Sequence, residues 1–225
     1  MRNLINWKGL KFPDIYIIRF FFKFVQNTQL EHKSVVEFGC GTGNNLYLFN
    51  IYGFKTQGID ISEENIKNAI YNFSEVLKAP ADSYKFLAGN MTQSEVLKEL
   101  EKPNDVLLLP NVVYYITREE FLTFLKEVKN ILSPKGVFFV RFRSPTDGRS
   151  LCLSLQNGKP ILKSDRTGEK DTVQTFYEEY EMVDLLREYL NIHNFKVFHS
   201  YDEVEIKGGK IFNSDIIIWG NFKIE

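Results

Sequence analysis

An acid and three glycines stand together in residues 35–45, which read VVEFGCGTGNN. Glu37 comes two residues before the first of the glycines Gly39, Gly41 and Gly43. Glycine has no Cβ, so it allows positive φ values and a close approach of a ligand to the backbone. A carboxylate at this place attracts a cationic group and repels a phosphate. The pattern therefore predicts a site for a small ligand that carries a positive charge.

A dinucleotide-binding loop is the main alternative, and its pattern G-x-G-x-x-G does not fit. Asn44 stands where one register of the glycines needs the third glycine, and Leu46 stands there in the other register. A second acid, Asp60, ends the next predicted strand. Enzymes that use NAD also carry an acid at this place. Asp60 alone therefore discriminates poorly, whereas the pair of Glu37 and Asp60 argues against a dinucleotide.

Strands and helices alternate around these residues, which predicts a parallel sheet with helices on both faces. The strands are expected at 34–39, 55–61, 83–89, 105–110 and 135–142, with two late strands at 195–206 and 214–224. The helices are expected at 44–52, 63–77, 93–100, 118–132 and 179–190. A short turn at 207–210 (KGGK) joins the late strands, so these two should be antiparallel.

Two segments lie outside this alternation. Residues 144–178 are polar and rich in turn residues, and Asn157-Gly158 predicts a β-hairpin within an insertion above the sheet. Residues 1–32 should contain a helix that starts after Pro13 and Asp14. Both segments are expected to cover the active site, with Trp7 and Tyr16 from the first, and Tyr177 and Tyr180 beside the second.

Composition and charge narrow the function classes. The chain has 225 residues, enough for one domain over 1–225, and its formal net charge is −1, which argues against nucleic acid as a partner. Cys40 and Cys152 form no CxxC motif, and the chain has no His cluster, so no metal site is expected and the cytoplasm is the expected location. Residues 15–25 are too short and too charged to span a membrane, although attachment to a membrane surface stays open.

The motif E-x-G-x-G-x-G, with the acid at the end of the second strand, resembles the first motif of class I S-adenosylmethionine-dependent methyltransferases. The turn LSPKG at 132–136 also fits, and the resemblance covers about residues 33–143. It implies a Rossmann-like α/β fold with a seven-stranded sheet of order 3-2-1-4-5-7-6, in which strand 7 is antiparallel. The cofactor-binding residues that it implies are Glu37, Gly39, Cys40, Gly41, Gly43, Asn44, Asp60, Ile61, Asn90, Met91, Pro110 and Asn111.

The resemblance also implies roles for these residues. Glu37 would pair with the α-ammonium group of the cofactor, Asp60 with both ribose hydroxyls, and Ile61 would pack on the adenine. The family often has an acid after the third strand to accept from the adenine amino group. This chain presents Asn90 instead, whose carbonyl oxygen can accept the same bond. A plain turn residue after Gly89 is the alternative interpretation of Asn90.

Candidate catalytic residues follow strands four and five. Tyr114 and Tyr115 could orient the methyl group or the acceptor, although one of them could belong to the core. Arg141 and Arg143 are two residues apart on a strand, so they share a face and could clamp a phosphate or carboxylate. Ion pairing with acids of the insertion, such as Asp147 and Glu169, is the alternative for such arginines.

The sequence thus predicts a methyltransferase that uses S-adenosylmethionine and yields S-adenosylhomocysteine. The expected acceptor is a small polar, anionic metabolite, such as a sugar phosphate or a nucleotide sugar, methylated on oxygen. Three alternatives stay open: a cofactor-binding regulator without catalysis, a methyltransferase for a lipid-like ring or a protein side chain, and an NAD oxidoreductase. The chain is expected to be a monomer or a homodimer.

Overall fold

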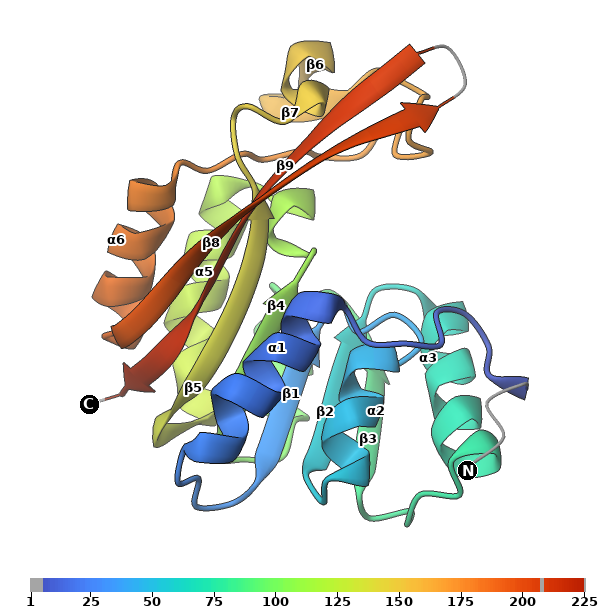
Figure 1. The fold of residues 1–225 in the computed structure, drawn as a ribbon, viewed down its shortest axis with the longest axis vertical. Helices are drawn as coiled ribbons and strands as arrows, with labels where there is room; N and C mark the ends of the chain where they lie inside the picture. Colours follow the sequence, from blue (N-terminus) through green and yellow to red (C-terminus); the bar gives the residue numbers. More distant parts are fainter. Residues whose placement is uncertain (1–5, 207–208, 225) are drawn as a thin grey trace.

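The computed structural model describes residues 6–206 and 209–224, and it contains a seven-stranded sheet of order β3-β2-β1-β4-β5-β9-β8 (Figure 1). The strands are β1 Ser34–Phe38, β2 Lys55–Asp60, β3 Tyr84–Ala88, β4 Asn104–Pro110, β5 Leu132–Arg143, β8 His193–Ile206 and β9 Gly209–Lys223. β1 to β5 pair in parallel, and β9 is antiparallel to both of its neighbours. The hairpin β6–β7 lies outside this sheet, so the predicted order 3-2-1-4-5-7-6 is confirmed.

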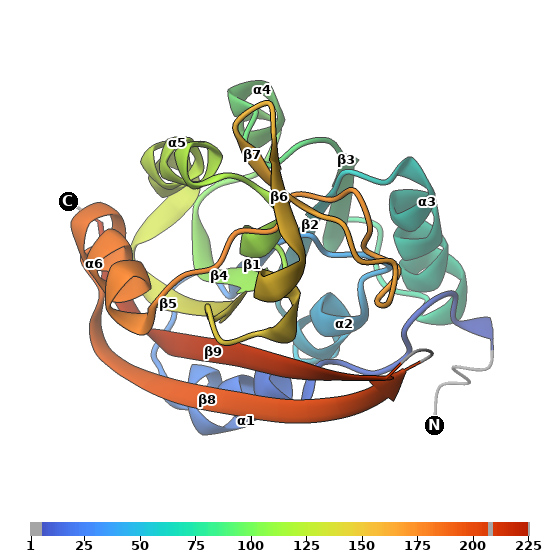
Figure 2. The same ribbon diagram turned by 90° about the horizontal axis from the view of Figure 1, so that it is seen from above.

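Helices cover both faces of the sheet (Figure 2). The helices are α1 Ile15–Lys23, α2 Asn44–Ile51, α3 Glu63–Tyr71, α4 Ser94–Lys98, α5 Arg118–Val128 and α6 Glu179–Leu190. The first three pack with one apolar cluster and the last three with another, so the sheet separates two cores. Such a sheet brings the carboxyl ends of β1, β2, β4 and β5 to one edge, where ligands bind in open α/β folds.

The predicted helix after Pro13 is present as α1. The Asp14 side chain accepts a hydrogen bond from Tyr16 N and caps the helix. Ile17, Phe20 and Phe21 are buried and dock the helix on the sheet.

The helix predicted over 63–77 differs from the observed one. Ser62 caps α3 as expected, but Asn72–Val76 form a π-helical turn. Asn72 is fully buried and donates through Nδ2 to Lys8 O and Thr42 O, at 2.9 and 3.0 Å. These contacts connect the end of α3 to the glycine loop and to the N-terminal segment. The spacing of apolar residues within 63–77 could not predict them, because the partners are distant in the sequence.

The predicted hairpin is confirmed as β6 Leu153–Gln156 and β7 Lys159–Leu162. Asn157 and Gly158 have φ of 51° and 75°, as a two-residue hairpin turn requires. β8 and β9 extend past the sheet as a two-stranded ribbon (Figure 1). Half of the turn predicted at 207–210, and residues 1–5 of the N-terminal segment, lie outside the described residues.

Within the described residues, no helix is long and apolar enough to cross a bilayer. The same residues contain no group of three or more His, Cys, Asp or Glu side chains placed to hold a metal ion.

Candidate active site

The glycine loop follows β1 and leads into α2. Gly43 has φ of +83°, and a Cβ there would lie 2.9 Å from the Phe73 ring. Gly41 also has positive φ, but a Cβ there would meet no atom within 4 Å. The loop is therefore packed against the protein at Gly43 and open at Gly41, where a ligand can approach the backbone.

Asp60 ends β2 and is fixed beside the loop. Its Oδ2 accepts from Gly41 N at 2.8 Å, and its Oδ1 accepts from Ser62 N at 2.9 Å and from Asn65 Nδ2 at 3.1 Å. A carboxylate has about four acceptor positions, so at least one position on Oδ2 is available to a ligand hydroxyl.

Glu37 is buried in β1 with an exposed fraction of 1%. Its Oε1 accepts from Asn45 Nδ2 at 2.7 Å, whereas Oε2 has no hydrogen-bond partner in the described part of the chain. Burial raises the pKa of Glu37 to about 8, and the nearby Asp60 and Asp14 add to this rise against the opposing effect of Asn45. A buried carboxylate oxygen without a partner is costly, so the position fits a cationic ligand group.

A cavity of about 570 Å³ lies in front of the loop and β2. Six predicted cofactor residues line it: Gly39, Asp60, Ile61, Asn90, Met91 and Asn111. Ile61 is 77% exposed, which leaves its apolar surface free to pack on a planar ligand. The structure thus brings together predicted residues from the ends of four strands, β1, β2, β3 and β4.

Six other cofactor residues of the sequence prediction do not line this cavity: Glu37, Gly41 and Gly43, described above, and Cys40, Asn44 and Pro110. Cys40 is buried in the apolar core, where the missing Cβ of Gly58 leaves room for its Sγ, and burial raises the pKa of its thiol. Asn44 donates through Nδ2 to Phe12 O at 3.1 Å and so holds the N-terminal segment. Pro110 is buried at the end of β4. These residues support the shape of the loop rather than the wall of the cavity.

Asn90 lines the cavity with its oxygen engaged in a turn. Oδ1 accepts from both Thr92 N and Thr92 Oγ1 at 3.0 Å. Both acceptor positions of the amide oxygen are thus used within the turn, as the alternative interpretation expected.

The cavity also has residues that the sequence analysis missed: Val112, Ile116, Glu120, Lys159, Thr172 and Val173. Lys159 comes from the hairpin of the insertion, and its Nζ bonds Glu120 Oε1 at 3.0 Å. The insertion therefore supplies one wall of this cavity. Val112 and Ile116 could have been predicted, because they belong to the apolar residues that directly follow β4. The residues of the insertion could not, because no sequence pattern relates them to the strand ends.

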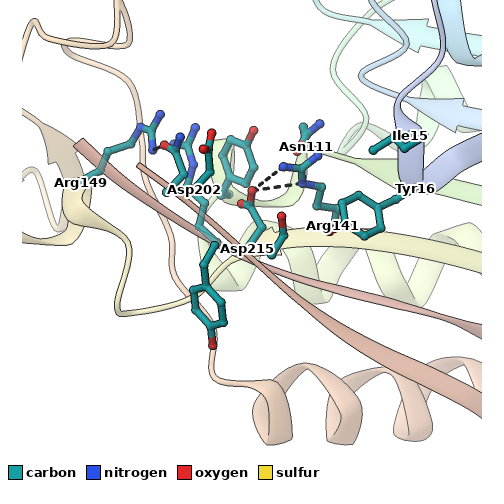
Figure 3. Close-up of a pocket in the computed structure, with 12 residues that line it drawn as sticks. Ile15, Tyr16, Asn111, Arg141, Arg149, Asp202 and Asp215 are labelled. Carbon is teal, nitrogen blue, oxygen red and sulfur yellow. Dashed lines mark hydrogen bonds and ion pairs between the residues drawn. The ribbon is translucent and has the colours of Figure 1, made fainter. Parts of the chain in front are cut away.

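A second cavity, of about 500 Å³, shares the lining residue Asn111 with the first. Figure 3 shows the residues that line this second cavity. It lies between the start of α1, the ends of β4 and β5, and the β8–β9 ribbon. Tyr114, Arg141 and Arg143, three of the four predicted catalytic residues, line it. Tyr16 of the N-terminal segment also lines this cavity.

The two adjacent tyrosines face different cavities. Tyr114 lines the second cavity, with the guanidinium carbon of Arg143 3.9 Å from its ring centre, and burial raises its pKa. Tyr115 lines the first cavity, and its hydroxyl donates to Glu169 Oε1 at 2.5 Å. Burial also raises the pKa of Tyr115, and both Tyr114 and Glu169 add to this rise.

Tyr177 and Tyr180 line neither cavity. Tyr177 is fully buried against Phe121 and Phe142, so the expectation that it closes over a substrate is wrong. Tyr180 is exposed on α6.

Arg141 is the centre of a charge network at the second cavity. Its Nη1 donates to Asp14 Oδ2 at 2.7 Å and its Nη2 to Asp215 Oδ2 at 2.6 Å (Figure 3 shows the second pair). These carboxylates lie on α1 and β9, so one side chain joins the N-terminal segment to the sheet. The charge of Arg141 is thus compensated within the protein.

Arg143 is compensated as well. Its Nη2 donates to Glu169 Oε1 at 2.6 Å, and it also bonds Gln174. Glu169 accepts a further bond from Arg149, which pairs with Asp147. Although burial opposes it, hydrogen bonds from Tyr115 and Arg143 and the charge of Arg143 lower the pKa of Glu169 to about 2. The alternative of pairing with insertion acids thus holds for Arg143, through Glu169, whereas the partners of Arg141 lie outside the insertion and Asp147 pairs with Arg149.

Comparison with known proteins decides the family. The methyltransferase domain family matches residues 16–189, which is most of the chain. The chain belongs to this family. The methyltransferase prediction from the glycine loop and its acids is therefore confirmed. No curated protein sequence matches this methyltransferase domain.

Solved structures show the same fold. A SAM-dependent methyltransferase of Methanosarcina mazei has a TM-score of 0.62 and 19% identity, over 90% of this chain and 98% of that one. A SAM-dependent methyltransferase of Clostridium acetobutylicum has a TM-score of 0.62 and 16% identity, with 93% and 90% covered. Magnesium protoporphyrin IX methyltransferase of Synechocystis, with bound SAH, has a TM-score of 0.59 and 15% identity, with 93% and 82% covered.

Proposed function

We propose that this methyltransferase domain transfers a methyl group from S-adenosylmethionine to a small polar acceptor. The observation that carries the proposal is the buried Oε2 of Glu37, which has no partner in the described part of the chain, at the start of a glycine loop that is open at Gly41. The α-ammonium group of the cofactor is a cation that can donate a hydrogen bond to this oxygen atom. The Synechocystis protein, which has the same fold, binds the product form of this cofactor.

The residues present fit the cofactor: Asp60 and Ile61 line the first cavity, and Glu37 lies on the neighbouring strand β1. Glu37 Oε2 holds the ammonium group, Asp60 Oδ2 accepts from a ribose hydroxyl, and Ile61 packs on the adenine. Because Asn90 Oδ1 is used in its turn, we propose that its Nδ2 donates to the adenine edge. When bound, the cofactor supplies a methyl group on a sulfonium, which is already a good leaving group.

The acceptor is proposed to occupy the second cavity, which shares the lining residue Asn111 with the first. Methyl transfer depends mainly on alignment and on the exclusion of water. The Tyr114 hydroxyl, which stays protonated because burial raises its pKa, can donate to an acceptor oxygen and orient it. Lys159 and Val173 of the insertion form one wall of the first cavity, and we propose that they limit the access of water to it.

The charge network changes the expected class of acceptor. The preference for an anion depended on Arg141 and Arg143 as a clamp, and each arginine has carboxylate partners within the protein. Asp202, on the same wall, adds a further negative charge. An anion would have to compete with these carboxylates, so we propose an uncharged or cationic polar acceptor with oxygen as the acceptor atom.

Incubation with S-adenosylmethionine and matched pairs of small metabolites tests this proposal. Each pair consists of a hydroxyl compound and its phosphorylated form, and mass spectrometry detects the gain of one methyl group. We expect methylation of unphosphorylated members, with S-adenosylhomocysteine formed in equal amount. Preferential methylation of the phosphorylated members would contradict this proposal and support the hypothesis that Arg141 and Arg143 bind an anionic acceptor. A single-turnover experiment without any methylated product would favour the non-catalytic alternative.

A further inference from the structure

The N-terminal segment has bulky apolar side chains that face away from the protein. Leu10, Phe12, Ile15 and Phe22 are 73%, 72%, 54% and 42% exposed. Ile15 and Phe22 lie seven residues apart on α1 and share its outer face, because the buried residues of this helix point to the sheet. Exposed apolar side chains gathered in this way indicate a surface for another molecule.

The same segment is basic. Residues 6–30 contain Lys8, Lys11, Arg19 and Lys23 against one acid, Asp14, whereas the whole chain has a net charge of −1. Asp14 pairs with an arginine of the sheet and is 19% exposed, so it does not offset the outer basic charges. We call the exposed side chains of residues 8–23 the N-terminal surface. Its combination of apolar and basic groups is typical of segments that bind anionic bilayers.

This surface is held in place. Lys8 N donates to Asn72 Oδ1 at 2.8 Å, Asn44 Nδ2 donates to Phe12 O at 3.1 Å, and Asp14 N donates to Asn45 Oδ1 at 2.9 Å. The backbone is thus fixed at the start of α2, while the side chains of Leu10 and Phe12 are exposed. Figure 1 shows the segment before α1 running over the top of α2. A segment pinned at three points presents these side chains to a partner without first having to fold.

We infer that the N-terminal surface binds the surface of a bilayer that contains anionic lipids. Leu10, Phe12, Ile15 and Phe22 enter the interface, and the basic side chains contact the head groups. Ile15 also lines the second cavity, so this orientation brings the mouth of that cavity to the lipid surface. This orientation gives a polar acceptor at the level of the head groups direct access to the cavity. That consequence rests on the proposed function, whereas the binding to the bilayer does not.

Vesicle co-sedimentation tests the inference with the full chain. The probes are vesicles of phosphatidylcholine alone and vesicles of phosphatidylcholine mixed with phosphatidylglycerol. We expect binding to the mixed vesicles only, weakened by salt. The Leu10→Ser/Phe12→Ser variant should bind at least about ten-fold more weakly. The matched control is Leu151→Ser/Leu155→Ser, which removes two equally exposed leucines at 89% and 79% from the insertion and should bind like the wild type.

A second pair of variants tests the charge. Lys11→Gln/Arg19→Gln should weaken binding to the mixed vesicles, whereas Lys126→Gln/Lys129→Gln, on the opposite face of the sheet, should not. No binding to the mixed vesicles, equal binding to both kinds, or equal loss in the control variants would overturn the inference. Calorimetry of S-adenosylhomocysteine with each variant measures the cofactor site separately, so failure of vesicle binding and failure of the proposed function are distinguishable.

Discussion

Glu37 allows a sharp test of the cofactor site. When a cation binds beside this buried carboxyl group, the carboxyl group should lose its proton and become a carboxylate. The pKa of Glu37 is raised from 4.5 to about 8, mainly by burial. At pH 7 about nine tenths of this group is therefore protonated in the ligand-free protein. An ammonium group at Oε2 favours the carboxylate. We expect cofactor binding at pH 7 to release about one proton, and Glu37→Gln to abolish this release.

The same shift has a consequence for stability, and its sign follows from proton linkage. Between pH 4.5 and about 8 the folded protein keeps a proton on Glu37 that the unfolded chain has lost. The free energy of unfolding therefore falls as the pH rises through this window, by up to about 1.4 kcal/mol per pH unit. Over the whole window from pH 4.5 to about 8, the contribution of Glu37 to the free energy of unfolding is on the order of 5 kcal/mol. This contribution is present in full below pH 4.5 and is lost above about pH 8. Glu37→Gln should lack this part of the pH dependence.

Calorimetry measures the proton release directly. S-adenosylhomocysteine is titrated at pH 7 in buffers that differ in ionisation enthalpy, and the slope of the heat gives the number of protons. Glu120→Gln is the control, because Glu120 lines the first cavity, but its pKa is lowered by hydrogen bonds and by Lys159. Equal slopes for the wild type and Glu37→Gln would refute the assignment of the ammonium group to Glu37.

Three further predictions follow from the site and its loop. Asp60→Asn should weaken binding of S-adenosylhomocysteine roughly ten- to a hundred-fold in calorimetry, since a hydrogen bond to a charged group is lost; unchanged affinity would reject its role. Gly43→Ala should lower the free energy of unfolding in urea by roughly 1–3 kcal/mol, and by more than Gly53→Ala, which has similar φ but no neighbour within 4 Å; equal losses would contradict the packing argument. Arg141→Leu should cost roughly 3–5 kcal/mol in urea, because its two carboxylate partners lose their cation, and a loss below about 1 kcal/mol would contradict this network.

Local features of the sequence were sufficient for the fold and for one half of the site. The glycine loop, the cap at Ser62 and the Asn157-Gly158 turn each depend on the conformations that a few neighbouring residues allow. Glu37 and Asp60 could be placed at one sheet edge because parallel strands end there together. The predicted sheet order then came from the family resemblance.

The rest depends on contacts between distant residues. Arg141 pairs with Asp14 and Asp215, which are 127 and 74 residues away in the sequence. The sequence alone therefore could not distinguish an arginine that is free to bind an anion from one whose charge is compensated within the protein. Lys159 reaches the first cavity only because the insertion folds back over the sheet. Tyr177 shows the reverse error, because a tyrosine next to a loop can just as well fill the core.

A crystal structure with S-adenosylhomocysteine tests the central claim most directly. We predict the ligand in the 570 Å³ cavity, with its ammonium nitrogen about 3 Å from Glu37 Oε2 and a ribose hydroxyl at Asp60. A ligand bound elsewhere, with Glu37 still bonded to Asn45 alone, would contradict the account.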